Sequence, residues 1–139
     1  MESSTPRRIL IVAHRTAATP ALIKAVRERA ARGSVSFALL VPRPYWDPDT
    51  EEAALTLALA LPLLDEAVGD RVEGLVGDPD PFVAVQDALA RERFDEVIVS
   101  TLPARVSHWL RRDLPSRVEQ LGLPVTVVTA EARRHPVTR

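Results

Sequence analysis

The chain has 139 residues, of which 46% are hydrophobic and 27% charged, as in one ordinary globular domain. Its 18 Lys and Arg residues against 19 Asp and Glu residues leave a formal net charge of -1, which argues against a protein that coats nucleic acid or an anionic membrane. Because the sequence contains no cysteine, disulfides, thiolate catalysis and cysteine-ligated metal sites are excluded.

The apolar stretches and the start of the chain indicate neither a membrane span nor a secretory signal. The longest apolar stretch covers residues 53–64, which is shorter than the roughly 18 to 20 residues that cross a bilayer. The opening MESSTPRR lacks the apolar core of a secretory signal. We therefore expect a cytoplasmic protein without membrane or nucleic-acid partners, with a flexible N-terminus (1–6), one domain (7–130) and a mobile tail (131–139).

The first part of the chain predicts a strand, a helix and a second strand. Residues 8–13, RILIVA, form a short run rich in β-branched residues, typical of a strand buried on both faces of a parallel sheet. Thr19 offers an N-cap and Pro20 a first helical residue, and Gly33 ends this helix. Residues 35–41, VSFALLV, predict the second strand.

A second helix is predicted to begin at Thr50. Pro62 is expected to kink it late, because the proline ring clashes with a carbonyl of the preceding turn; alternatively, the helix ends near Leu61. Its leucines lie four residues apart on one face: Leu55, Leu59 and Leu63.

The third strand and third helix are separated by a turn rich in Asp and Pro. Residues 71–76 alternate in polarity and read as a more exposed edge strand. Asp80 is the predicted N-cap of the helix that follows, and Pro81 its first residue. The buried stripe of that helix is predicted to consist of Phe82, Val85 and Leu89.

The last part of the chain predicts two strands around an interrupted helix. Residues 95–101 form the fourth strand and residues 124–129 the fifth. Pro115 is expected to bend or restart the helix between them. The helical stripe runs through Val106, Leu110 and Leu114 and continues at Val118 and Leu121.

Strands and helices that alternate through short loops predict a single α/β domain: three layers, doubly wound, around a five-stranded parallel sheet. In such a sheet, ligands bind beyond the carboxyl ends of neighbouring strands whose connections run to opposite faces. With the first strand central, this point lies between the first and fourth strands. The expected crevice is bounded by residues 14–16 and 100–103, with the exit of the second strand at Val41 and Pro42 as a third wall.

Four segments in this order resemble the universal stress protein family over nearly the whole chain. They are RILIVAH near the start, the Gly-Asp-Pro turn at residues 77–79, FDEVIVST at the fourth strand and LPVTVV at the fifth. The resemblance implies a five-stranded parallel α/β fold of order 3-2-1-4-5. It also implies a homodimer that forms through the last strand, and it implies ATP binding in many members.

The nucleotide-binding pattern of that family is not matched here. The family has an Asp at the end of the first strand, where this chain has His14, and a glycine signature after the fourth strand, whose first two glycines fall on Ser100 and Pro103. The closing pair of the signature falls near Arg112-Asp113 or Pro115-Ser116. Glycine lets a backbone approach phosphates closely, and proline cannot donate an N–H. The resemblance therefore implies a divergent member from the branch without ATP binding.

Several residues of the expected crevice are candidates for binding an anion. Cationic and hydroxyl side chains suit a phosphate or a carboxylate, and the start of the first helix adds backbone N–H groups. The alternatives are a polar loop, capping of strand ends, and a solvated helix face for the basic residues. The candidates are His14, Arg15, Thr16, Val41, Ser100, Thr101, Arg105 and Arg112.

Three functions compete. The first is a non-enzymatic, universal-stress-type regulatory or binding module, dimeric through residues 124–129, with a protein partner and no certain cofactor or metal. The second is a nucleotide-binding stress-response protein that holds ATP or AMP through arginine and hydroxyl groups in place of the glycines. The third, an enzyme of the adenine nucleotide α-hydrolase type, has the least support because neither a glycine loop nor an acid/base pair is present.

Overall fold

The computed structural model describes residues 6–44, 51–102, 109 and 113–130. In these residues, five parallel strands form one sheet of order β3-β2-β1-β4-β5, which confirms the predicted fold and strand order. The strands are β1 (Arg7–Val12), β2 (Val35–Pro42), β3 (Glu73–Gly77), β4 (Glu96–Thr101) and β5 (Val125–Thr129).

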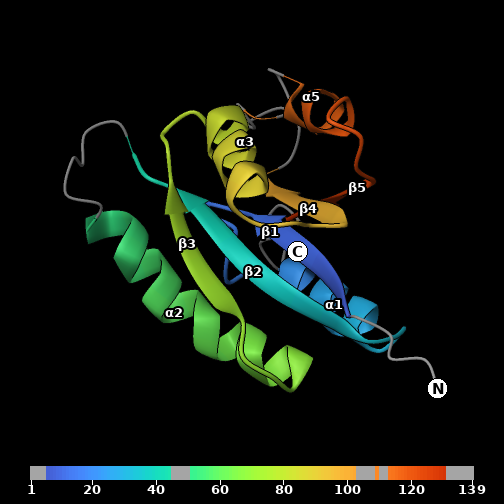
Figure 1. Ribbon diagram of the computed structural model, residues 1–139. Helices are drawn as coiled ribbons and strands as arrows, with labels where there is room; N and C mark the ends of the chain where they lie inside the picture. The colour runs from blue at the N-terminus through green and yellow to red at the C-terminus, as the bar shows by residue number, and fades with distance from the viewer. Residues whose placement is uncertain (1–5, 45–50, 103–108, 110–112, 131–139) are drawn as a thin grey trace, which may run out of the picture.

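Helices cover both faces of this sheet. Contacts join α1 to α2 on one face and α3 to α5 on the other, so that Figure 1 shows three layers with the sheet in the middle. The helices are α1 (Pro20–Ala30), α2 (Glu51–Val68), α3 (Pro81–Arg91) and α5 (Leu114–Glu119).

Two of the predicted helix starts are confirmed by their capping contacts. The Thr19 hydroxyl accepts a hydrogen bond from the Leu22 amide at 3.4 Å, and the Asp80 carboxylate accepts one from the Phe82 amide at 2.9 Å. Each cap satisfies an amide that has no partner within its own helix. These caps fix the starts of the helices that follow β1 and β3.

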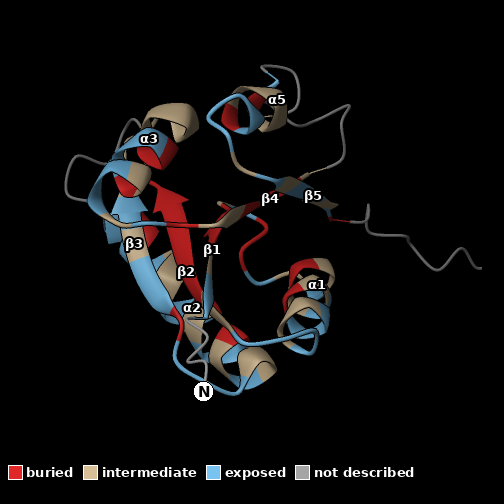
Figure 2. Cartoon of the chain, turned by 45° about the vertical axis from the view of Figure 1, so that its right-hand side comes forward, coloured by how far each residue is buried: buried red, intermediate tan, exposed pale blue. Residues whose placement is uncertain are grey.

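The central strands supply most of the core. Residues 9–12 of β1 and 37–41 of β2 are buried, as Figure 2 shows for the middle of the sheet. Their side chains alternate between the two faces, so that Ile9 and Ile11 pack with α1 and α2 while Leu10 and Val12 pack with α3 and α5. The runs of continuous apolar residues therefore correspond to strands with helices on both sides.

One alternative for α2 is wrong. The helix continues through Pro62 to Val68 and does not end near Leu61. Its face toward the core carries Ala53, Ala60 and Leu64. The leucines that the pattern singled out lie on the opposite side and are exposed: Leu55 by 61%, Leu59 by 72% and Leu63 by 41%.

A smaller difference concerns α3. The buried residues of α3 are Ala84, Val85 and Ala88, whereas Phe82 and Leu89 are only half-buried. Small residues face the sheet because the helix approaches it closely: a Cβ on Gly77 would lie 2.7 Å from the Ala84 Cβ. The β3 strand is an edge strand, as expected.

Among the helices that the structure describes, none is long and apolar enough to cross a bilayer.

Candidate functional site

The carboxyl ends of β1 and β4 form the switch point of the sheet. β1 leads into α1 on one face, whereas α5, which precedes β5, packs with α3 on the other face. β1 and β4 are direct neighbours, with Val12 opposite Val99. The loop after β1 and the end of β4 therefore lie side by side, where ligands bind in open parallel sheets.

The loop after β1 is a series of turns tied to the start of α1. The Ala13 amide continues the ladder by donating to the Leu40 carbonyl at 3.1 Å. The Thr16 carbonyl accepts hydrogen bonds from both the amide and the hydroxyl of Thr19, at 3.2 and 2.9 Å. Since Thr19 also caps α1, the position of Thr16 is set by the helix start.

Thr16 and Ser100 connect the loop after β1 to the end of β4. Their hydroxyl oxygens are 2.6 Å apart, and the residues are only 2% and 1% exposed. One hydroxyl donates to the other, so both buried residues have a hydrogen-bond partner. Two of the hydroxyls that were candidates for binding an anion therefore link the loop after β1 to β4.

The neighbouring hydroxyl of Thr101 is different. Thr101 is 2% exposed, and its Oγ1 has no hydrogen-bond partner in the part of the chain that the structure describes. Its backbone carbonyl accepts from the Ala130 amide at 2.8 Å, which fixes the residue at the end of the ladder. A buried hydroxyl without a partner is costly, and a bound ligand is one way of satisfying it.

His14 and Arg15 contribute two kinds of donor. His14 is half-buried; burial and the adjacent Arg15 guanidinium lower the pKa of its imidazole, while Glu52 acts in the opposite direction. The imidazole is therefore neutral at pH 7, and Arg15, which is exposed, carries the positive charge of this loop. Sequence reasoning missed Glu52, because only the fold brings the start of α2 toward the loop after β1.

The remaining candidates are placed less favourably or not at all. Val41 is fully buried among the residues packed against α1 and α2, so its side chain belongs to the core. Arg105 and Arg112 lie outside the described residues. The next described residue, Asp113, has φ 57°, a left-handed conformation that favours glycine. The closing pair of the family's signature was expected near Arg112-Asp113, so Asp113 corresponds to its second residue.

A groove that sequence reasoning did not find lies between β3 and α3. It has a volume of about 270 Å³, with a floor that includes Leu40, Leu75 and Phe94. Arg43 and Arg91 lie on its rim together with three carboxylates. It belongs to the outer half of the sheet, beside the β3 edge, and not to the switch point.

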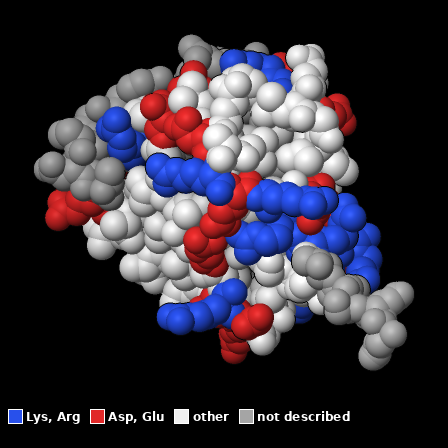
Figure 3. Space-filling model, viewed as in Figure 1, with Lys and Arg blue, Asp and Glu red and all other residues white. Residues whose placement is uncertain are grey.

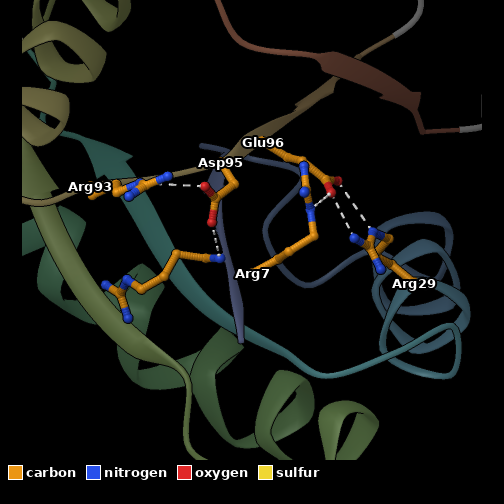
Figure 4. Close-up of polar contacts among 6 residues, drawn as sticks. Arg7, Arg29, Arg93, Asp95 and Glu96 are labelled. Carbon is orange, nitrogen blue, oxygen red and sulfur yellow. Dashed lines mark hydrogen bonds and ion pairs between the residues drawn. The ribbon is translucent and has the colours of Figure 1, made fainter. Parts of the chain in front are cut away.

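The amino ends of the strands carry a cluster of ion pairs, shown in Figure 4. Arg29 of α1 donates two hydrogen bonds to the Glu96 carboxylate, at 2.6 and 3.2 Å, and Arg7 adds a third at 2.9 Å. These bonds lower the pKa of Glu96. The Asp95 carboxylate accepts from the Arg8 amide at 2.9 Å. This cluster joins β1, β4 and α1 at the end of the sheet opposite the crevice, so its role is structural.

Metal binding finds no support in the described residues, where no three His, Asp or Glu side chains gather in a way that could hold an ion.

Comparison with known proteins gives relatives at the level of structure only. No protein-family model matches the chain, and no curated protein matches it. The chain is similar to a universal stress protein in complex with cAMP, with a TM-score of 0.66, 15% identity and coverage of 92% of this chain and 100% of that chain. It is also similar to a universal stress protein from Archaeoglobus fulgidus, with a TM-score of 0.64, 17% identity and coverage of 88% and 93%.

A third similar structure is a universal stress protein family protein from Arabidopsis thaliana with AMP bound. Its TM-score is 0.60 at 14% identity, with coverage of 91% of this chain and 94% of that chain. The resemblance read from the sequence is thus confirmed for the fold: this chain has the three-layer fold of the universal stress proteins. At these identities the likeness extends to architecture and not to ligands or assembly.

Proposed function

We propose that this chain is a non-enzymatic regulatory module that acts as a homodimer and binds a nucleoside monophosphate of the AMP type at its switch-point crevice. The observation that carries the proposal is the set of groups at the carboxyl ends of β1 and β4. The buried Thr101 hydroxyl at the end of β4 has no partner among the described residues, and the neutral His14 and the exposed Arg15 begin the loop after β1.

A monophosphate suits this crevice better than a triphosphate. The five glycines of the chain are at positions 33, 69, 74, 77 and 122, so neither the loop after β1 nor the segment from β4 to α5 contains one. Without glycine, the backbone offers little room for a long phosphate chain. A single phosphate needs fewer donors, and Arg15 supplies a charge-assisted one. Two of the similar structures hold AMP and cAMP, which supports the same ligand class here.

Binding without catalysis fits the state of Ser100 at the end of β4. The Ser100 hydroxyl is hydrogen-bonded to Thr16 and not to a base that would activate it. Among the residues that the structure describes, the Ser100 hydroxyl has Thr16 and not the His14 imidazole as its hydrogen-bond partner. We therefore assign the crevice to recognition of a ligand and not to its turnover.

Titration calorimetry with AMP, cAMP, ATP and ATP with magnesium tests the ligand. We expect AMP to bind more tightly than about 100 μM, which corresponds to roughly -5.5 kcal/mol, and ATP to bind more weakly than AMP. Arg15→Ala removes the charged donor and is expected to weaken AMP binding about tenfold. Arg32→Ala, an exposed arginine after α1, is the matched control and should bind like the wild type. Absence of heat at millimolar AMP would overturn the ligand assignment.

The homodimer is proposed to form through β5, the edge strand at one end of the sheet. The Pro124 carbonyl accepts from Val97 at 3.0 Å, and the Ala130 amide donates to Thr101 at 2.8 Å, so even-numbered residues of this segment face β4. Because backbone groups alternate along a parallel ladder, the odd-numbered ones point away from the sheet. The outward-facing backbone groups belong to Val125, Val127 and Thr129.

Val127→Pro tests that interface without breaking the sheet. It removes an outward N–H that β4 does not use, and proline is tolerated on edge strands. Light scattering at about 50 μM should give a dimer for the wild type and a monomer for this variant, while Val127→Thr, which keeps the N–H, should remain a dimer. A monomeric wild type, or a dimer that survives Val127→Pro, would contradict the β5 interface.

A second candidate is a protein-interaction module without a nucleotide. The Thr16–Ser100 hydrogen bond favours it, because each hydroxyl already has a buried partner and is not free to bind a phosphate. Calorimetry separates the two candidates: in the second case neither AMP nor ATP gives heat or raises the melting temperature.

A further inference from the structure

The outer face of α2 is an exposed apolar stripe on a protein whose core is otherwise well covered. Its side chains are Leu55, Leu59 and Leu63, exposed by 61%, 72% and 41%. They lie at i, i+4 and i+8, so they form one row along the helix. In Figure 3 the surface where α2 lies in Figure 1 is mostly free of charged side chains.

This stripe is not needed for folding, because α2 already has a face in the core. Ala53, Ala60 and Leu64 are fully buried against the sheet, and Leu57 and Leu61 pack beside them. A helix on the surface of a domain is normally apolar on one side only. An apolar row on the second side marks a surface where another molecule docks.

The stripe has defined ends, and both are acidic. Ala58 and Pro62 are exposed beside the leucines and widen the row. Glu51 in the first turn and Glu66 in the last turn are exposed, and α2 contains no lysine or arginine. From Glu51 to Glu66 the helix rises about 22 Å, at about 1.5 Å per residue.

The charges select one kind of occupant. A second copy of α2 laid against this face, in either direction, would bring carboxylates next to carboxylates. An anionic membrane surface would be repelled in the same way. A helix with basic residues at both ends of its own apolar row would gain contact along the leucines and attraction at the ends.

We propose that the outer face of α2, from Glu51 to Glu66, docks an amphipathic helix of a partner protein whose apolar stripe is flanked by lysine or arginine. The leucine row inserts between the apolar side chains of the partner helix, which is the usual recognition mode for helices in apolar grooves. The acidic ends set the position of the partner along α2.

This surface is separate from the proposed dimer and from the crevice. α2 packs on β2 and β3, whereas β5 is the last strand at the other side of the sheet. A dimer through β5 would leave both copies of the α2 face open. The docking proposal therefore stands whether or not the dimer or the nucleotide is confirmed.

Fluorescence anisotropy with a labelled peptide of about 18 residues tests the proposal, since shorter isolated helices are marginal in water. The peptide carries three leucines at i, i+4 and i+8 with two lysines beyond each end; a second peptide has glutamates in place of the lysines. We expect the lysine peptide to bind the full chain at least tenfold more tightly than the glutamate peptide.

Two variants and a matched control define the face. Leu59→Gln should weaken binding of the lysine peptide at least tenfold. The melting temperature of this variant protein should stay at or above that of the wild type, because the Leu59 side chain is 72% exposed. Leu121→Gln changes a leucine that is 40% exposed after α5 and should have no effect. Replacing Glu51 and Glu66 together by lysine should reverse the preference between the peptides.

Three results would overturn the docking proposal. The first is equal binding of both peptides, which would mean unspecific apolar contact. The second is self-association in sedimentation velocity that Leu59→Gln abolishes, which would make a second copy the occupant. The third is capture by anionic phospholipid vesicles that depends on Leu59, which would make the face a membrane contact.

Discussion

Thr16 and Ser100 provide a direct test of how the two sides of the crevice are held together. Their hydroxyl oxygens are 2.6 Å apart and both residues are almost completely buried. Ser100→Ala would leave the Thr16 hydroxyl without a partner, and Thr16→Val would do the same to Ser100. Each orphaned hydroxyl should cost about 1–3 kcal/mol of unfolding free energy, which lowers the melting temperature by about 3–5 °C per kcal/mol in a domain of this size.

The double variant separates the hydrogen bond from the loss of side-chain atoms. With both hydroxyls removed, neither position leaves an unpaired hydroxyl, so the loss should be about 1–2 kcal/mol smaller than the sum of the single losses. Urea unfolding followed by circular dichroism measures all four proteins, with the slope in urea as a check that the unfolded states are alike. Additive single losses would refute a direct Thr16–Ser100 interaction.

Thr101→Val is the matched control on the same strand. Its hydroxyl is buried and has no partner among the described residues. Removing it should leave the unfolding free energy unchanged or raise it by up to about 1 kcal/mol. If the hydroxyl binds AMP as proposed, the same variant should weaken AMP binding without loss of stability. A loss of stability of more than about 1 kcal/mol would show that the hydroxyl has a partner after all.

Three further predictions follow from the charges and the backbone. Glu96→Gln should lower the unfolding free energy by about 1–3 kcal/mol at pH 7. Because the fold lowers the pKa of Glu96, its contribution to stability is present above the ordinary glutamate pKa and is lost as the pH falls below about 4. Urea unfolding of the variant and the wild type should therefore converge at low pH. As the pH falls below about 6.5, His14→Gln should lose less unfolding free energy than the wild type. The reason is that the pKa of His14 is lowered in the fold, so the unfolded wild-type chain takes up the proton first. Parallel profiles of unfolding free energy against pH would contradict this. Asp113 has a left-handed backbone with φ 57°. Asp113→Gly should therefore be neutral or stabilising by up to about 1 kcal/mol, and Asp113→Ala should be destabilising by about 1 kcal/mol. Equal melting temperatures for the two variants would contradict the left-handed conformation.

Local chemistry explains why so much of the fold could be predicted from the sequence. The β-branched run of β1 leaves few alternatives to a buried parallel strand. The pairs Thr19-Pro20 and Asp80-Pro81 each combine a side-chain cap with a preset φ, so both helix starts were identified to the residue. The right-handed crossover rule then places the helices on the two faces, and with them the switch point.

The outer face of α2 shows where such reasoning fails. The helix is apolar nearly all round, so a period of 3.6 residues is satisfied by two different stripes. The sequence shows a row of leucines on one face, yet the packed stripe is built on Ala53, Ala60 and Leu64. The alanines let α2 lie close to the sheet and to α1, which longer side chains at those positions would prevent. Packing, and not periodicity, decides between the two faces.

The switch point could be located from the sequence, but its contacts could not. Thr16 and Ser100 are 84 residues apart along the chain, and nothing in the pattern of either loop indicates that their hydroxyls meet. The effect of Glu52 on His14 likewise depends on how α2 enters the fold. These contacts require the relative position of β1, β4 and α2 to within about an ångström, which hydrogen-bond geometry demands and sequence patterns do not encode.

The sheet order places the three proposed surfaces on different elements, and α1 contacts the surroundings of each. Its first turn is capped by Thr19, whose backbone and hydroxyl hold Thr16 at the crevice, and its body packs against both α2 and β5. Each of Arg15→Ala, Val127→Pro and Leu59→Gln should therefore alter one readout and leave the other two unchanged, because none of these side chains belongs to the shared helix. If AMP nonetheless shifts the dimer equilibrium or peptide binding, the route with contiguous contacts is a displacement of α1, visible as a change in amide exchange across Pro20–Ala30. Coupling without such a change would contradict this route.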